Sequence, residues 1–185
     1  MFGSEYEEPA LVALCIYAYK KVLSVSELLG LSKEQLQMVL DKLLLYNITD
    51  IKNKTVISYK HMAGLPLSNI EKDFLLDNGL DGVSTFLSIF YFDAVNDIFG
   101  EEKALELIKQ YYGGMLDLGA TTFWENYSPT WNENSIKIDE LPDKNKNSFH
   151  ADTGSICFKG LRKSLCHGWS AGVIKVLYKI LERTV

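Results

Sequence analysis

The chain is organised around one stretch, which reads Leu118-Gly119-Ala120-Thr121-Thr122-Phe123-Trp124-Glu125-Asn126. It follows a segment with strong helical periodicity and opens a long polar segment. Within the stretch one carboxylate, Glu125, lies beside an indole, a phenyl ring and two hydroxyls. Aromatic rings can stack on the apolar face of a pyranose, while a carboxylate can move a proton or activate a water. We therefore expect Glu125 to lie in a carbohydrate site.

Two longer blocks of sequence point to a family. The first block reads GGMLDLGATTFWE from Gly113 to Glu125, and the second reads CFKGLRKSLCHGW from Cys157 to Trp169. Between them lie Ile138-Asp139-Glu140 and His150-Ala151-Asp152-Thr153-Gly154. In this order and spacing, the blocks resemble the C-terminal part of the catalytic domain of the bacterial α-L-rhamnosidase family. The similarity covers roughly residues 79 to 172, about half of the chain.

The resemblance implies an all-α fold. Relatives fold as an (α/α)6 toroid, in which six helical hairpins form a ring around the active site. The 185 residues supply about half of that helix count, so we expect one helical domain over 1–185 that forms a partial toroid. A long loop of active-site type is expected at 126–163. An open half ring would expose apolar edges, which predicts a homo-oligomer, a partner chain that completes the ring, or rearrangement into a compact bundle.

The resemblance also implies roles for single residues. Glu125 falls on the position of the family's general base, which in an inverting enzyme deprotonates the attacking water. His167 belongs to the block that lines the sugar pocket in relatives, and neutral imidazole can both donate to and accept from sugar hydroxyls. The full set of expected substrate-binding residues is Trp124, Trp131, His150, Asp152, His167 and Trp169. The expected ligand is a terminal α-L-rhamnoside or a similar sugar.

Other features of the chain depart from the family pattern. The departures are Ala151, Thr153, Lys163 and Val173, all close to the expected pocket. The upstream half that carries the family's general acid is absent from the similarity, and an inverting glycosidase needs both carboxylates. Three aspartates near loops are the available candidates for an acid, namely Asp50, Asp77 and Asp81. We expect weak or no turnover from the isolated chain.

Two alternative functions follow from the missing acid. The chain could be a non-catalytic carbohydrate-binding or helical interaction module that kept the pocket wall and lost the chemistry. It could also be a helical scaffold without a ligand. A metal site built from Cys157, Cys166, His150 and His167 fits no zinc spacing, so we expect neither metal nor cofactor. Cys166 and His167 are adjacent and would point about 100° apart on a helix, which disfavours a nucleophile–base pair.

Composition excludes several classes of function. The formal charge is −5 and the pI about 5.2, which disfavours a nucleic-acid partner. No apolar run reaches the length of a membrane span. The N-terminal segment is acidic and not basic, so no signal peptide is expected. Three cysteines do not form a disulfide framework, and we expect a cytoplasmic protein.

Helical periodicity and capping signals predict where the helices lie. The expected ranges are 9–22, 32–44, 68–76, 82–99, 101–115 and 170–181, with 56–63 ambiguous. Capping boxes are expected at Ser32 with Gln35 and at Ser68 with Glu71. A sharp turn is expected at the three glycines between 113 and 119, because glycine adopts turn conformations freely.

Overall fold

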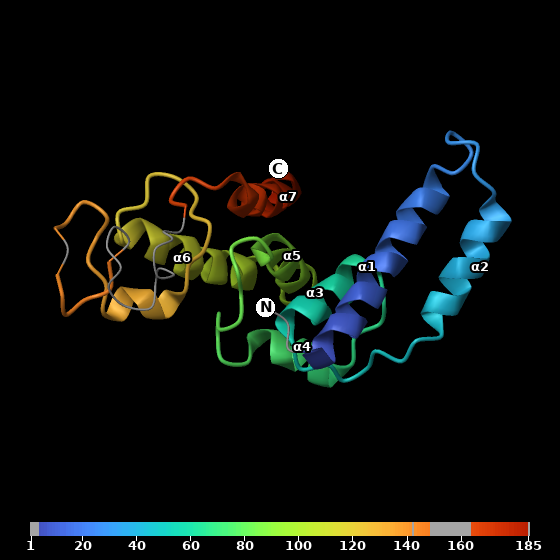
Figure 1. Cartoon of the computed structure of the whole chain (residues 1–185), viewed down its shortest axis with the longest axis horizontal. Helices are drawn as coiled ribbons and strands as arrows, with labels where there is room; N and C mark the ends of the chain where they lie inside the picture. Colours follow the sequence, from blue (N-terminus) through green and yellow to red (C-terminus); the bar gives the residue numbers. More distant parts are fainter. Residues whose placement is uncertain (1–3, 142, 149–163, 185) are drawn as a thin grey trace. The chain divides into compact units, whose positions relative to one another are not determined.

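The computed structural model describes residues 4–141, 143–148 and 164–184. In these ranges the protein is all-α, with seven α-helices and two short 3-10 helices (Figure 1). They contain no β-strand, and an isolated bridge joins Ser135 and Asn147. The all-α prediction is therefore confirmed.

The chain divides into two compact units, Met1–Asp77 and Asn78–Val185. The first unit holds α1 (Ser4–Ser24), α2 (Lys33–Leu44), α3 (Lys54–Met62) and α4 (Asn69–Leu76). The second holds α5 (Ser88–Phe99), α6 (Glu101–Asp117), η1 (Pro129–Glu133), η2 (Gly168–Gly172) and α7 (Val173–Thr184). A single helical domain over 1–185 stays a prediction.

In the first unit α1 packs against α2 and α3, and α3 packs against α4. Capping side chains close to each N-terminus set where α2 and α4 begin. The Ser32 hydroxyl caps α2 by accepting from the Gln35 N–H at 3.3 Å. At α4 the predicted capping box is confirmed, since Ser68 and Glu71 each bond to the other's backbone N–H. The predicted helix start at residue 9 is wrong, because α1 already begins at Ser4 and contains Pro9 in its interior.

A buried ion pair holds α3 and α4 together. Lys60 Nζ lies 2.5 Å from Glu71 Oε1, and the two side chains are 2% and 1% exposed. The same ammonium donates to the Ile48 carbonyl at 2.5 Å, and the carboxylate accepts from the Ile51 and Ser68 N–H groups at 3.2 and 3.0 Å. A buried charge is tolerated only when it is paired and hydrogen-bonded, and this pair meets both conditions.

Removing one partner of this pair should destabilise the protein strongly. We expect Lys60→Met to lower the free energy of unfolding by about 3–5 kcal/mol, because Glu71 would then be a buried charge without its cation. Urea unfolding measures the loss. Lys33→Met is the matched control, because Lys33 pairs with Glu27 on an exposed surface and should change stability little. Equal effects of the two substitutions would contradict the assigned role.

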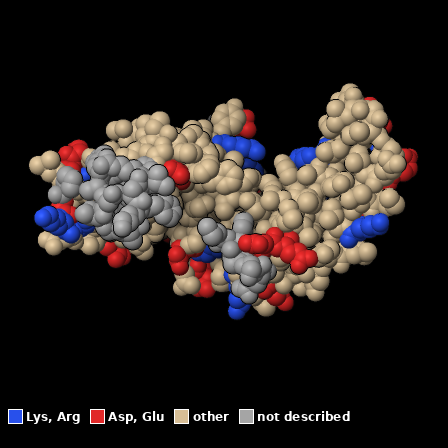
Figure 2. Space-filling view, viewed as in Figure 1, with Lys and Arg blue, Asp and Glu red and all other residues tan. Residues whose placement is uncertain are grey.

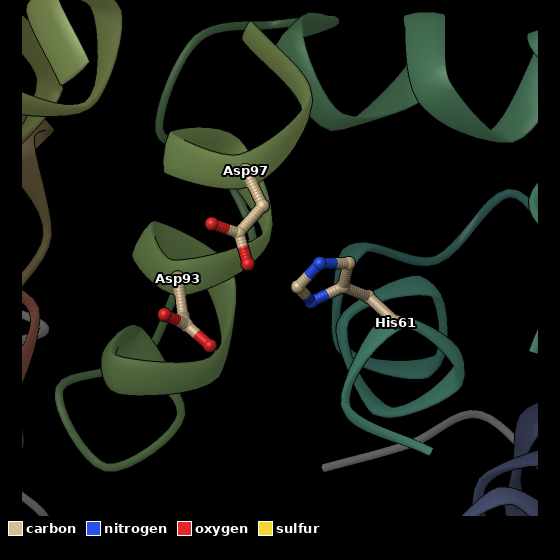
Figure 3. Close-up of side chains that lie close together, drawn as sticks. All are labelled: His61, Asp93 and Asp97. Atoms are coloured by element: carbon tan, nitrogen blue, oxygen red, sulfur yellow. The ribbon is translucent and has the colours of Figure 1, made fainter. Parts of the chain in front are cut away.

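The second unit is built on an antiparallel pair of helices, α5 and α6, which pack together and are joined through Gly100 at φ +92°. Helices are therefore present in both predicted ranges, 82–99 and 101–115, but α5 begins at Ser88 and not at Gly82. Helix α7 packs against both helices. Asp93 and Asp97 lie one turn apart on α5 (Figure 3), and Lys179 of α7 donates to them at 2.6 and 2.8 Å.

Burial alone would lower the pKa of Lys179, but its hydrogen bonds to Asp93 and Asp97 and their negative charges raise it overall. The ammonium therefore stays charged and ties α7 to α5.

None of the helices in the described ranges is long and apolar enough to cross a membrane. On the face seen in Figure 2, acidic and basic side chains lie in small groups among a larger area of other residues.

The predicted turn at Gly113 and Gly114 is wrong, because both residues lie inside α6, which ends at Asp117. Only Gly119, at φ +92°, makes the turn that leads into the Glu125 segment. Gly114 has a different reason to be glycine. A Cβ at this position would lie 2.1 Å from Oη of Tyr127, whereas a Cβ at Gly113 would meet no atom within 4 Å.

The two neighbouring glycines give a matched test of this packing. We expect Gly113→Ala to stabilise the protein by about 1 kcal/mol, because alanine has the higher helix propensity. Gly114→Ala should instead destabilise it, since the new methyl group would displace the Tyr127 ring. Thermal unfolding of both variants measures the difference. Stabilisation by Gly114→Ala as large as that by Gly113→Ala would contradict the close contact.

Candidate functional site

A cluster of three tyrosines, the buried Tyr111 and Tyr127 and the half-buried Tyr112, packs next to the Glu125 segment. The hydroxyl of the fully buried Tyr111 donates to the carbonyls of Val83 and Tyr127, both at 3.1 Å. Tyr112 donates to the Ser170 carbonyl at 2.8 Å. The rings of Tyr111 and Tyr127 meet edge to face, with centroids 5.1 Å apart. These bonds fix the core of the second unit where the two sequence blocks meet.

The two blocks that carry the family resemblance are paired through their backbones. His167 N–H donates to the Phe123 carbonyl at 2.7 Å, and Glu125 N–H donates to the Ser164 carbonyl at 2.8 Å. Ser170, which is fully buried, donates its hydroxyl to the Trp124 carbonyl. Segments about 40 residues apart in the chain are therefore held side by side.

The carboxylate of Glu125 is oriented by this pairing. Its Oε2 accepts from the Ser164 N–H at 2.7 Å, and the side chain is half-buried. The backbone of the same residue is held from two sides, because its carbonyl accepts from the Thr85 hydroxyl and from Trp169 Nε1, the latter at 3.2 Å. Among the described residues, the groups that bond to Glu125 include neither a cation nor a second carboxylate.

An exposed aromatic surface lies beside Glu125. Trp169 is 46% exposed, and its ring packs against Phe86, which is 47% exposed, at a centroid distance of 5.3 Å. On the same indole lies the His167 ring, at 4.1 Å and tilted by 43°. A carboxylate next to exposed rings and an imidazole combines stacking surface with hydrogen-bonding groups, which is what a sugar site requires.

The other predicted site residues lie apart from this surface. Trp124 is 1% exposed, and its ring packs 6.5 Å from that of Tyr127, so its ring is part of the core. Trp131 lies in η1 with its ring 6.0 Å from Tyr127. Stacking of a sugar on Trp124 or Trp131 stays a prediction. His150 and Asp152, and Cys157 of the disfavoured metal cluster, lie outside the described residues.

The sequence did not identify three residues that shape the site. Thr85 and Phe86 fall within the helix predicted at 82–99, but they precede α5. Thr85 bonds to Glu125, and Phe86 packs against Trp169. Ser164 binds the carboxylate through its backbone N–H, a role that does not depend on the side chain. The position of Ser164 within the second block was the one available signal for it.

A pocket of about 530 Å³ opens next to the site, between α6, α7 and the two paired segments. Phe123 and His167 belong to its wall, but Glu125 and Trp169 do not. His167 is therefore shared, since it lies on Trp169 and also borders the pocket.

Comparison of the chain with protein-family models, with curated proteins and with solved structures finds no match. Assignment of a function therefore depends on the geometry of the site and on the sequence resemblance.

The tyrosine cluster predicts a loss of stability at alkaline pH. Burial raises the pKa values of Tyr112 and Tyr127 from 10.0 to about 12, and it also raises the pKa of Tyr111. The unfolded chain releases these protons near pH 10, so their contribution to stability is complete below about pH 10 and is lost as the pH rises through about 12.

Urea unfolding at about pH 9 and about pH 11 tests this loss of stability, because the two pH values lie on either side of the pKa of tyrosine in an unfolded chain. We expect the free energy of unfolding to fall between them, and to fall less in Tyr112→Phe. Tyr178→Phe is the control, because Tyr178 is exposed and should leave the slope unchanged. The same slope in Tyr112→Phe as in the unmodified chain would contradict the effect of burial.

Proposed function

We propose that the second unit carries a carbohydrate site of the α-L-rhamnosidase type, and that the chain is part of a six-hairpin toroid. The observation that carries this proposal is the backbone pairing of the two resembling blocks, through Phe123 with His167 and Glu125 with Ser164. If the two blocks resembled the family only by chance, their pairing in the folded chain would not be expected. Here their pairing brings a carboxylate, an indole and an imidazole together.

In this proposal Glu125 is the base that deprotonates the attacking water. The Ser164 N–H holds Oε2 at 2.7 Å, while Oε1 has no hydrogen-bond partner among the described residues and is available to a water. Trp169 and Phe86 offer the stacking surface for the sugar ring, and His167 bonds to a sugar hydroxyl. The ligand is a terminal α-L-rhamnoside or a sugar of similar shape.

An inverting reaction also needs a general acid on the opposite side of the sugar. The groups that bond to Glu125 include no second carboxylate in the described part of the chain. The acid would then come from a second copy or from a partner chain that completes the ring. Exposed leucines of the first unit, such as Leu28 and Leu45, provide apolar surface for such a contact. The isolated chain would bind sugar with weak or no turnover.

A non-catalytic carbohydrate-binding module is the second candidate function. The same absence of a carboxylate partner favours it, because a carboxylate, an imidazole and two exposed rings are sufficient to bind a sugar without cleaving it. Both candidates require sugar binding at Trp169 and differ in whether hydrolysis occurs once the ring is complete.

Thermal-shift titration with L-rhamnose tests the shared requirement. We expect a saturable rise of the midpoint, because a ligand that binds only the folded state stabilises it by RT ln(1 + [L]/Kd). Trp169→Ala should remove the rise, and Glu125→Gln should reduce it. Tyr178→Ala is the matched control, because it also removes an exposed ring but lies on α7 away from the site. It should leave the rise intact.

No rise with L-rhamnose or with a panel of other monosaccharides would contradict both candidate functions. A rise that survives Trp169→Ala would contradict the location of the site. Release of L-rhamnose from an aryl α-L-rhamnoside, abolished by Glu125→Gln, would favour the enzyme over the binding module.

A further inference from the structure

The pocket beside His167 has a chemical character that differs from that of the proposed sugar site. Its volume, about 530 Å³, lies in the range of small-molecule pockets. Apolar side chains of α6 and α7 form a large part of its wall, including Ile108, Met115, Leu116, Ile174 and Leu177. All of the lining residues belong to the second unit.

The described lining includes no Asp, Glu, Lys or Arg. Two of its hydroxyl groups already donate within the protein, since Tyr112 donates to the Ser170 carbonyl and Thr122 to the Leu165 carbonyl. The imidazole of His167 and the hydroxyl of Thr121 also belong to the lining, and they make no hydrogen bond to described residues. The pocket therefore offers a large apolar surface and, in His167 and Thr121, two polar side chains that make no hydrogen bond to described residues.

This balance selects against both a sugar and a charged molecule. A pyranose would bury several hydroxyls against aliphatic walls, and each buried hydroxyl without a partner costs free energy. An ion would lose its hydration, and no charged side chain of the described lining would replace it. A molecule with an apolar ring or chain and one or two hydroxyls matches the described lining, because its hydroxyls can bond to His167 and Thr121.

We propose that the pocket between α6 and α7 is a second ligand site, which binds an uncharged amphipathic small molecule. The apolar body lies against Leu116, Ile174 and Leu177, and a hydroxyl of the ligand bonds to His167 or Thr121. The site shares His167 with the one proposed for sugar but is otherwise distinct from it, because neither Glu125 nor Trp169 lines the pocket. It does not depend on the carbohydrate proposal.

The probe for this site is 2-naphthol, which is neutral at pH 7 and carries one hydroxyl on an apolar ring system. Its charged relative, 2-naphthoate, is the chemical control. Titration of the full chain, followed by naphthol fluorescence, should give saturable binding of 2-naphthol and at least about tenfold weaker binding of 2-naphthoate, a difference of about 1.4 kcal/mol.

Two exposed positions on α7 give matched variants. Ile174 lines the pocket and is 55% exposed, whereas Leu181 is 63% exposed and does not line it. Because both side chains are largely exposed, neither substitution should unfold the protein. We expect Ile174→Gln to weaken 2-naphthol binding roughly five- to tenfold through the lost apolar contact, and Leu181→Gln to leave it unchanged.

Modification of cysteine locates the bound probe independently of the variants. Cys166 is exposed and lines the pocket, whereas Cys15 lies on α1 in the first unit. Saturating 2-naphthol should slow alkylation of Cys166 several-fold and leave that of Cys15 unchanged, as read by mass spectrometry of the peptides.

Absence of saturable binding would overturn the proposal, and so would equal affinity for 2-naphthoate. Equal weakening by Ile174→Gln and Leu181→Gln, or unprotected Cys166 at saturation, would show that the probe binds elsewhere and would also overturn it. L-rhamnose binding is measured in a separate experiment. A negative result for 2-naphthol therefore does not affect the test of the sugar site, and a negative result for L-rhamnose does not affect the test of this pocket.

Discussion

The backbone pairing of 123–125 with 164–167 is the constraint on which the site depends. Two N–H···O=C bonds join the segments, and the Ser164 N–H extends the pairing to the carboxylate of Glu125. Side chains from elsewhere fix the same backbone, because Thr85 bonds to the carbonyl of Glu125 and Ser170 to that of Trp124. The bond from a backbone N–H orients the carboxylate directly.

The core beneath this pairing shows how polar side chains are buried at low cost. Hydroxyls of tyrosine and serine reach backbone carbonyls, as Tyr111 does with Val83 and Tyr127. Each such bond satisfies a buried carbonyl that no helix ladder satisfies. The close approach of Tyr127 to α6 is possible because Gly114 has no Cβ. These hydrogen bonds attach the loops of the candidate site to the helices beneath them.

Local patterns predicted the helices well, because caps and periodicity act over a few residues. Ser68 and Glu71 form their capping box as expected, and Glu101 opens α6 directly after Gly100. Predictions failed where tertiary contacts decide. The stretch before α5 has the apolar composition of a helix, yet it is not helical. Instead, Thr85 bonds to Glu125 and Phe86 packs against Trp169.

The site was predictable in part for the same reason. Sequence resemblance selected Glu125, His167 and Trp169, and the structure brings them together. The resemblance did not show which of the two tryptophans, Trp124 or Trp169, is buried, because burial depends on residues far away in the sequence. Trp124 lies in the core, and Trp169 lies at the surface.

Amide hydrogen exchange followed by NMR tests whether the segments 123–125 and 164–167 are paired. We expect slow exchange at the amides of Glu125, Ser164 and His167, because each of them donates to a protein acceptor. We also expect Glu125→Gln to speed exchange at Ser164 more than at His167, since only the Ser164 amide bonds to the altered side chain. Exchange of all three amides at the rate of an unfolded chain would contradict the pairing and the site built on it.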